Sequence, residues 1–113
     1  MPHDLVNPSL LEELHGIGGK EFVSELLNQF QSDAKERLVS LSAATEKIDR
    51  ETIRATAHAI KGSSASVGAV KMQSLSGQIE EGATSLSDTD LKSKVAELTG
   101  ALDETMQVLS SMM

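Results

Sequence analysis

The sequence predicts an all-α fold, an antiparallel up-down four-helix bundle with a short additional N-terminal helix, as a single domain over residues 1–113. Apolar residues recur at helical spacing almost throughout the chain. Capping residues and glycines interrupt this spacing at several points, which argues against one continuous coiled coil. Because the chain has only two aromatic residues, its core must be aliphatic, and such a core favours helix-on-helix packing over a sheet.

The first helix is expected to be short. Asn7 is a capping residue and Pro8 fits the first helical position, so the helix begins there. The glycines expected to end it are Gly16, Gly18 and Gly19. Its apolar side chains are Leu10, Leu11, Leu14 and Ile17. These four either close one end of the bundle or form a partly exposed docking patch, and both interpretations remain open.

A long second helix is expected from Lys20 to Thr45. Its buried stripe is predicted to contain Phe22, Leu26, Phe30, Ala34, Leu38 and Leu41. Asp49 then caps a third helix. The buried stripe of that helix is predicted to be Ile53, Ala57, Ile60, Ser64 and Val67. Gly68 can adopt a left-handed conformation and is expected to end the third helix.

Two further helices complete the predicted bundle. The fourth is expected over residues 69–85, and its inward residues are Met72, Leu75, Ile79, Ala83 and Leu86. Ser87, followed three residues later by Asp90, resembles a capping box and begins the last helix. The inward residues of the last helix are Leu91, Val95, Leu98, Leu102, Met106 and Leu109. Short turns between long amphipathic helices make sequential helices antiparallel neighbours.

Composition excludes several classes of partner and site. The formal net charge of −7 disfavours nucleic acid and anionic membranes, since both need a clustered positive surface. Without cysteine the chain has no disulfide, thiolate nucleophile or thiolate metal site. We find no apolar stretch long enough to span a bilayer and no signal-peptide core near the start. A cytoplasmic location is therefore expected.

His58 is predicted to project into solvent from the middle of the third helix. A helix advances about 100° per residue, which places His58 roughly 140° to 160° from the buried Ile53 and Ile60. Its neighbours on the helix surface are Arg54, Ala55, Lys61, Gly62 and Ala65. None of these is a large apolar residue, so another protein could reach the imidazole. An exposed imidazole offers its neutral, nucleophilic form at neutral pH.

Lys61 and Gly62 lie one turn further along, on the side of the helix that carries His58. The lysine offers a positive charge and rotatable N–H donors to an anion attached to the histidine. A glycine inside a helix costs about 1 kcal/mol relative to alanine, which suggests a packing or access reason for its presence. Here the missing side chain would let a partner approach the imidazole closely.

A residue that orients the imidazole is expected on the fourth helix, because the turn at Gly68 folds that helix back. Reflecting His58 about this turn gives four candidates, namely Gly77, Gln78, Glu80 and Glu81. We favour Glu80, which follows the core residue Ile79. A carboxylate there would accept the Nδ1 proton and leave Nε2 free to attack. Whether Glu80 or Gln78 orients His58 remains open.

The window from Ala57 to Gly68 resembles the signature of histidine-containing phosphotransfer (HPt) domains. In that signature Leu or Ile, Lys and Gly follow the histidine at the second, third and fourth positions, before a run of small residues and another Gly. The matching residues are His58, Ile60, Lys61, Gly62, Ser63, Ser64, Ala65 and Gly68. Leu75 and Ile79–Glu80 also resemble the family's following helix.

This resemblance implies a phosphorelay intermediate rather than an enzyme with its own ATP site. A receiver domain, from a response regulator or a hybrid histidine kinase, would pass the phosphoryl group of its phospho-aspartate to Nε2 of His58. A second receiver would then take it. By the same resemblance Lys61 helps hold the phosphoryl group, Gly62 gives access and Glu80 hydrogen-bonds near the imidazole. No cofactor or metal is expected on this chain, Mg²⁺ is expected on the receiver, and the protein is expected to be a monomer.

Two other functions compete with this one. A histidine kinase dimerisation module usually has an acidic residue directly after its histidine, where this chain has Ala59, and the chain lacks room for an ATP-binding domain. A helical adaptor would bind receiver domains without being phosphorylated, but such proteins generally lack the histidine. His3 and His15 are expected to be surface residues rather than metal ligands, since no two histidines have a spacing of four.

Overall fold

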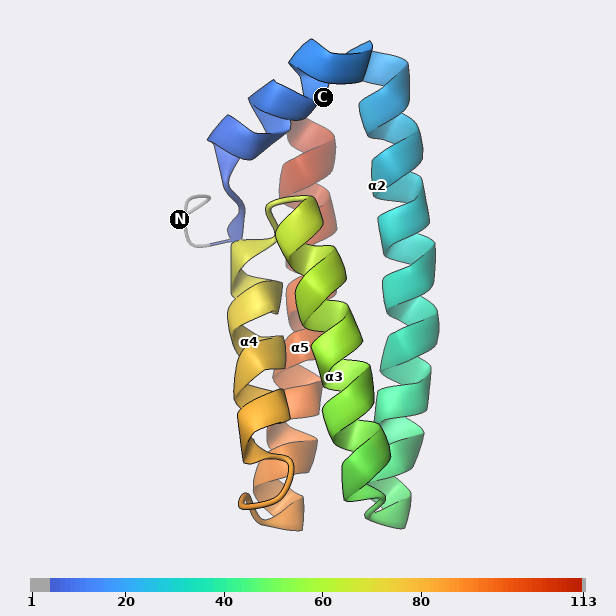
Figure 1. Ribbon diagram of the computed structural model, residues 1–113, viewed down its shortest axis with the longest axis vertical. Coiled ribbons are helices and arrows are strands. Elements are labelled where there is room, and N and C mark those ends of the chain that lie inside the picture. Colours follow the sequence, from blue (N-terminus) through green and yellow to red (C-terminus); the bar gives the residue numbers. More distant parts are fainter. Residues whose placement is uncertain (1–4, 113) are drawn as a thin grey trace.

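The computed structural model describes residues 5–112, and all regular structure in that range is helical. The helices are α2 (Pro8–Lys47), α3 (Arg50–Ser66), α4 (Val70–Gly82) and α5 (Asp88–Ser111). They lie along the long axis of a molecule measuring 42 × 24 × 18 Å, and the chain reverses direction at each turn (Figure 1). Each helix packs on the next, and α5 packs back on α2. The predicted all-α class is confirmed.

α2 bends sharply at Gly19. As predicted, Asn7 caps the helix, and its side chain accepts hydrogen bonds from two backbone N–H groups of the first turn. The prediction that Gly16 and Gly18 help to end a first helix is wrong, since both lie inside the helical run. The backbone leaves the helical region only at Gly19, where φ is 79° and ψ is −175°. The part before this break crosses one end of the molecule, and the rest runs alongside α3 (Figure 1).

The buried face of α2 differs from the predicted one near its start. Val23 and Leu27 are buried there, whereas Phe22 is 38% exposed and Leu26 is half-buried. From Phe30 onward the predicted residues are buried. Steps of four residues advance about 400°, so the predicted run of such steps drifts around the helix. Combining steps of four and three residues keeps the side chains on one face of the helix. Counted back from Phe30, such steps lead to Leu27 and Val23, which are the buried residues.

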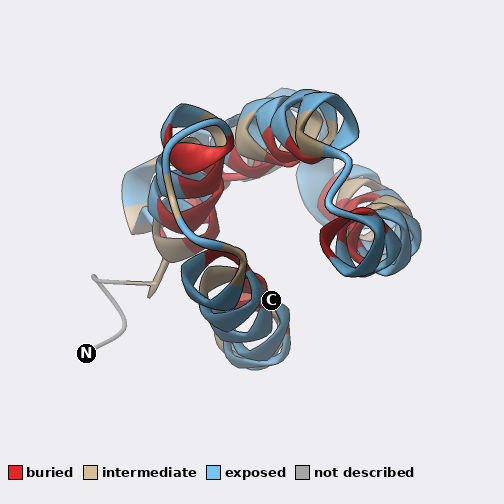
Figure 2. Cartoon of the chain, turned by 90° about the horizontal axis from the view of Figure 1, so that it is seen from below, coloured by how far each residue is buried: buried red, intermediate tan, exposed pale blue. Residues whose placement is uncertain are grey.

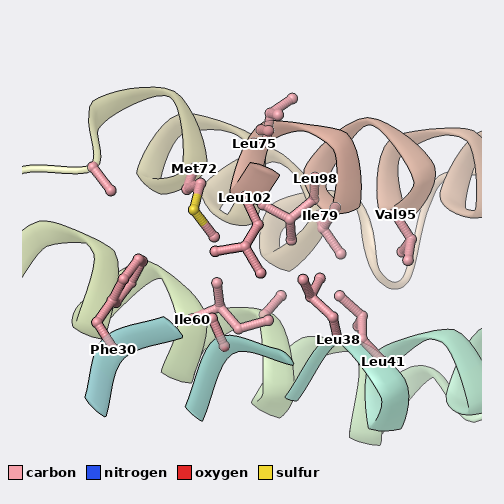
Figure 3. Packing of buried hydrophobic residues seen from close by; sticks show 14 of the residues in the cluster. Phe30, Leu38, Leu41, Ile60, Met72, Leu75, Ile79, Val95, Leu98 and Leu102 are labelled. Atoms are coloured by element: carbon pink, nitrogen blue, oxygen red, sulfur yellow. The ribbon is translucent and has the colours of Figure 1, made fainter. Parts of the chain in front are cut away.

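The remaining predicted stripes are buried except at Leu86 and Met106, which are half-buried. Their side chains meet those of α2 between the helices (Figure 3), and buried residues face inward around the axis (Figure 2). Asp49 and Ser87 cap α3 and α5 as predicted, each accepting a hydrogen bond from a backbone N–H of the first turn. Among the described helices, none combines the length and apolar character that crossing a membrane requires.

Gly68 joins the end of α3 to the N-terminal segment. Its φ of 74° is left-handed, as predicted for the residue that ends α3. Its carbonyl oxygen accepts a hydrogen bond of 2.8 Å from the backbone N–H of Asn7. A Cβ at this position would lie 3.2 Å from the Asn7 carbonyl oxygen and 3.4 Å from Leu10 Cδ2. Both the conformation and the close neighbours therefore favour glycine.

At the opposite end of the molecule, Arg50 fastens the start of α3 to the turn between α4 and α5. Its Nη1 donates to the carbonyl oxygens of Ala83 and Leu86 at 2.8 and 2.9 Å, and its Nη2 donates to Asp88 at 2.9 Å. These carbonyls follow the last turn of α4 and have no partner within that helix. The guanidinium thereby satisfies them and fixes the relative position of three helices.

The four apolar residues of the first segment divide between the two expected environments. Leu11 is buried in the core, Leu10 and Leu14 are half-buried, and Ile17 is 76% exposed. The leucines thus cover one end of the core. Ile17 is the member that remains available to a partner.

Candidate functional site

His58, Lys61 and Glu80 form one cluster across α3 and α4. His58 projects from the middle of α3 with 65% of its side chain exposed, and its Nδ1 lies 2.8 Å from Oε2 of Glu80. Lys61 Nζ lies 2.6 Å from the other carboxylate oxygen, Oε1. Glu80 is only 19% exposed and so forms the floor of the cluster. One carboxylate therefore holds both the imidazole and the ammonium group.

The contact with Glu80 selects one tautomer of His58. An ionised carboxylate can only accept hydrogen bonds, so the Nδ1 atom that it contacts must carry the proton. In the neutral ring the other nitrogen, Nε2, then has a free lone pair. Since the ring is mostly exposed, this lone pair is open to an electrophile brought by another molecule.

The charge of Glu80 is fixed by its neighbours. The Lys61 ammonium is the largest influence holding the pKa of the Glu80 carboxyl below its ordinary value, and the hydrogen bond from His58 acts in the same direction. Burial opposes these effects but does not outweigh them. Glu80 is therefore ionised at neutral pH and can stabilise positive charge on the imidazole.

Two glycines shape the surface around the cluster in different ways. A Cβ added at Gly62 would meet no atom within 4 Å, so nothing in the described part of the chain requires glycine there for packing. A Cβ at Gly77 would lie 3.5 Å from Lys61 Cδ, which is ordinary contact. Gly77 thus lies beside the aliphatic part of Lys61, and an added methyl group would contact it without a clash.

In the described part of the chain, no hydrogen bond joins the other candidates from α4 to His58. Gln78 turns toward α5, where its Oε1 accepts a hydrogen bond of 2.8 Å from Lys94 Nζ. Its amide nitrogen donates to Ser74 on its own helix. Glu81 is exposed. Between Gln78 and Glu80, the residue that contacts the imidazole is Glu80.

From its position in the sequence, Arg54 is expected only to neighbour His58 on the surface of α3. Arg54 lies one turn before the histidine, its side chain is 45% exposed, and its Nη2 pairs with Glu51 at 2.7 Å. Its spacing of four residues from His58 was visible in the sequence and places both side chains on one face of α3. Arg54 therefore adds a second cation to the surface that carries the imidazole.

Among the described residues, the other histidine and the acidic side chains form no comparable site. His15 is half-buried on α2, and His3 lies outside the described residues. Within residues 5–112, no group of three His, Asp or Glu side chains is arranged to hold a metal ion.

Replacing Glu80 with glutamine should change how stability depends on pH. Because the Glu80 pKa is held below its ordinary value of 4.5, the folded protein binds fewer protons here than the unfolded chain as acid is added. The stabilisation is full above the unfolded-state pKa and is lost as pH falls through the folded-state pKa. In urea unfolding, the free energy of unfolding of wild type should exceed that of Glu80→Gln at pH 7, and this difference should shrink at pH 3.

Glu81→Gln is the matched control, since it removes an exposed carboxylate from the next position of α4. Its difference from wild type should be the same at both pH values. If the free energy of unfolding of Glu80→Gln also differed from that of wild type by the same amount at both pH values, the ion pair with Lys61 would not stabilise the fold.

Comparisons with known proteins agree on one family. The family model described as "Hpt domain" matches residues 25–111. Histidine-containing phosphotransfer protein 2 of Arabidopsis thaliana is 35% identical over 68 residues, which span 58% of this chain and 44% of that protein. The chain thus matches less than half the length of this curated relative.

Solved structures share the fold. A rice chain described as a histidine-containing phosphotransfer protein superposes with a TM-score of 0.87 at 24% identity, over 99% of this chain and 83% of its own. Histidine-containing phosphotransfer protein B of Pseudomonas aeruginosa has a TM-score of 0.65 at 26% identity, over 95% of this chain and 86% of its own.

Proposed function

Because the chain belongs to the Hpt-domain family, we propose that it is a phosphocarrier of a multistep two-component phosphorelay and that His58 is its phosphoacceptor. One observation supports this assignment most directly. The imidazole is mostly exposed, and Glu80 holds its Nδ1, so the free lone pair lies on Nε2. A phosphoryl acceptor needs this combination of a fixed ring and an open lone pair.

The proposed transfer is a direct displacement on phosphorus. The Nε2 lone pair attacks the phosphoryl group of a receiver phospho-aspartate, an N–P bond forms, and the P–O bond to the aspartate breaks. The aspartate leaves as a carboxylate with the bonding electron pair. The imidazole keeps its Nδ1 proton and becomes a cation, and Glu80 at 2.8 Å stabilises that charge. The reverse reaction on a second receiver returns the ring to its neutral form.

The surrounding residues have supporting roles in this proposal. Lys61 keeps Glu80 in place and contributes positive charge beside the phosphoryl acceptor. Gly62 leaves the surface low enough for a receiver domain to approach. The receiver supplies Mg²⁺ and its own acidic pocket, so the reaction uses neither ATP nor a metal from this chain. We assign the protein to the cytoplasm as a monomer, with an antiparallel up-down four-helix bundle and a short first helix as its scaffold.

The test is phosphoryl transfer from a phosphorylated receiver domain. Label should move to this protein and behave as phosphohistidine, labile in acid and stable in alkali. If receiver domains bind the protein but label never moves from any of a broad panel, the protein is an adaptor and the phosphocarrier function is excluded.

A larger side chain at position 62 should hinder docking of a receiver domain without changing the reactivity of His58. We expect Gly62→Gln to slow transfer from a receiver about a hundredfold, because the added side chain displaces the docked partner from the imidazole. Uptake from phosphoramidate, a small phosphoryl donor, should be unchanged. Gly62→Ala should raise the free energy of unfolding by about 1 kcal/mol, since alanine is the better helix former.

Gly100 provides the matched control for residue 62. It also lies within a helix, α5, and its added Cβ would meet nothing within 4 Å. Gly100→Ala should stabilise the fold to the same degree, and Gly100→Gln should leave both transfer rates unchanged. Equal rates for Gly62→Gln and wild type with receiver donors would refute the access role.

A further inference from the structure

Two cations lie on the face of α3 that carries His58, and they are held very differently. Lys61 follows the histidine and Arg54 precedes it by one turn. Side chains on a helix lean toward its N-terminus, so the imidazole leans over the turn that carries Arg54. The same lean applies to all three side chains, so the two cations flank the imidazole at one turn on either side.

Lys61 is paired with Glu80, and separating the two is energetically unfavourable. Its Nζ is the cation paired with Oε1 of Glu80 in the described part of the chain, and that oxygen is buried without a well-aligned hydrogen bond from any other group. If Lys61 moved to a phosphoryl group, Oε1 would lose its nearest cation, and the carboxylate would keep only the imidazolium at Oε2. Removing one of the two cations from a largely buried carboxylate is unfavourable. Lys61 is thus best kept on Glu80 throughout the reaction.

Arg54 has no such constraint. Its partner Glu51 lies one turn away on the same helix, and the two side chains are 45% and 78% exposed. Exposed pairs of this kind contribute little to stability, because water solvates both groups well when they separate. Glu51 is the main cause of a raised pKa of Arg54, and the charge of Glu80 adds to it, so the guanidinium lies within the field of the cluster. Exchanging Glu51 for another anion therefore costs little.

We propose that Arg54 is a phosphoryl-binding residue: when His58 Nε2 carries the phosphoryl group, Arg54 releases Glu51 and donates to the phosphoryl oxygens, while Lys61 stays on Glu80. This inference rests on the proposed function. Guanidinium groups match phosphate oxygens with paired N–H donors, which suits Arg better than Lys for this role. The exchange moves no proton and breaks no covalent bond.

The test follows the phosphoryl group itself by ³¹P NMR. Wild type and variants are phosphorylated with phosphoramidate, which needs no receiver, and the ³¹P shift of the phosphohistidine is titrated with pH. A bound guanidinium favours the dianionic phosphoryl form, so Arg54→Gln should raise the pH midpoint of the titration by about 0.5. Glu51→Gln removes the competing anion and should lower the midpoint. Arg54→Lys should fall between wild type and Arg54→Gln.

Lys71→Gln is the control for loss of one positive charge. Lys71 lies on α4, and its Nζ pairs with Glu104 of α5 at 3.5 Å. Its midpoint should equal that of wild type. We also expect uptake from phosphoramidate to slow about fivefold in Arg54→Gln, the factor expected for one exposed ionic contact.

Two results would overturn the assignment of Arg54. One is an Arg54→Gln midpoint equal to that of wild type, and the other is a larger rise in Lys61→Gln than in Arg54→Gln. Failure of the proposed function is distinct from both, since wild type itself would then take up no phosphoryl group on His58. Circular dichroism of each variant confirms that the fold is retained.

Discussion

Replacing His58 with glutamine is expected to abolish phosphoryl uptake while leaving the fold and receiver binding intact. Glutamine has no nucleophilic ring nitrogen, but its amide N–H group can still donate to Glu80. Because the histidine side chain is 65% exposed, the free energy of unfolding should change by no more than about 0.5 kcal/mol. Labelled phosphoryl transfer, urea unfolding and calorimetric titration with a receiver domain measure the three properties separately.

His15→Gln is the matched control for this experiment. His15 is the other histidine in the described part of the chain, and it is half-buried on α2. Its variant should accept label at the wild-type rate. Label retained by His58→Gln, or lost equally in both variants, would remove His58 from the mechanism.

Gly68→Val is expected to be the most destabilising change among the glycines of the signature. A β-branched residue is strained at a φ of 74°, and its Cβ would press against the Asn7 carbonyl oxygen at 3.2 Å. Together these effects should lower the free energy of unfolding by about 3 kcal/mol. Urea unfolding measures the loss, and transfer by the folded fraction should remain normal.

Gly100→Val serves as the comparison, since Gly100 is helical and its surroundings are open. Its stability should remain close to that of wild type. If Gly68→Val were as stable as Gly100→Val, the contact between Gly68 and Asn7 would have no energetic importance. The two signature glycines would then differ less than their surroundings suggest, since Gly62 is open and Gly68 is enclosed.

Local signals in the sequence predicted the ends of the helices better than their faces. Asn7, Asp49 and Ser87 cap their helices as expected, because a capping side chain bonds to its own first turn and depends little on distant residues. The face of α2 was misjudged at Phe22 and Leu26. Two apolar stripes overlap there, and only packing against the other helices decides which is buried.

The contact of Glu80 with His58 could be predicted from the sequence because a tight turn joins α3 to α4. Counting outward from Gly68 limits the possible partners of the histidine to a few positions on α4. The count cannot choose among them, since side-chain direction depends on how the two helices rotate about their axes. The contact of Lys61 with Glu80 was not foreseeable either, as it depends on the same rotation of the two helices.

The hydrogen bond between Asn7 and Gly68 also bears on the order in which the molecule folds. It joins residues separated by more than half of the chain, whereas α3 and α4 are neighbours across a short turn. Closing a long loop costs more chain entropy than closing a short one, so the α3–α4 hairpin has the easier nucleus. The segment before Gly19 should then dock late and open early, as a local unit of lower stability than the helices that carry His58 and Glu80.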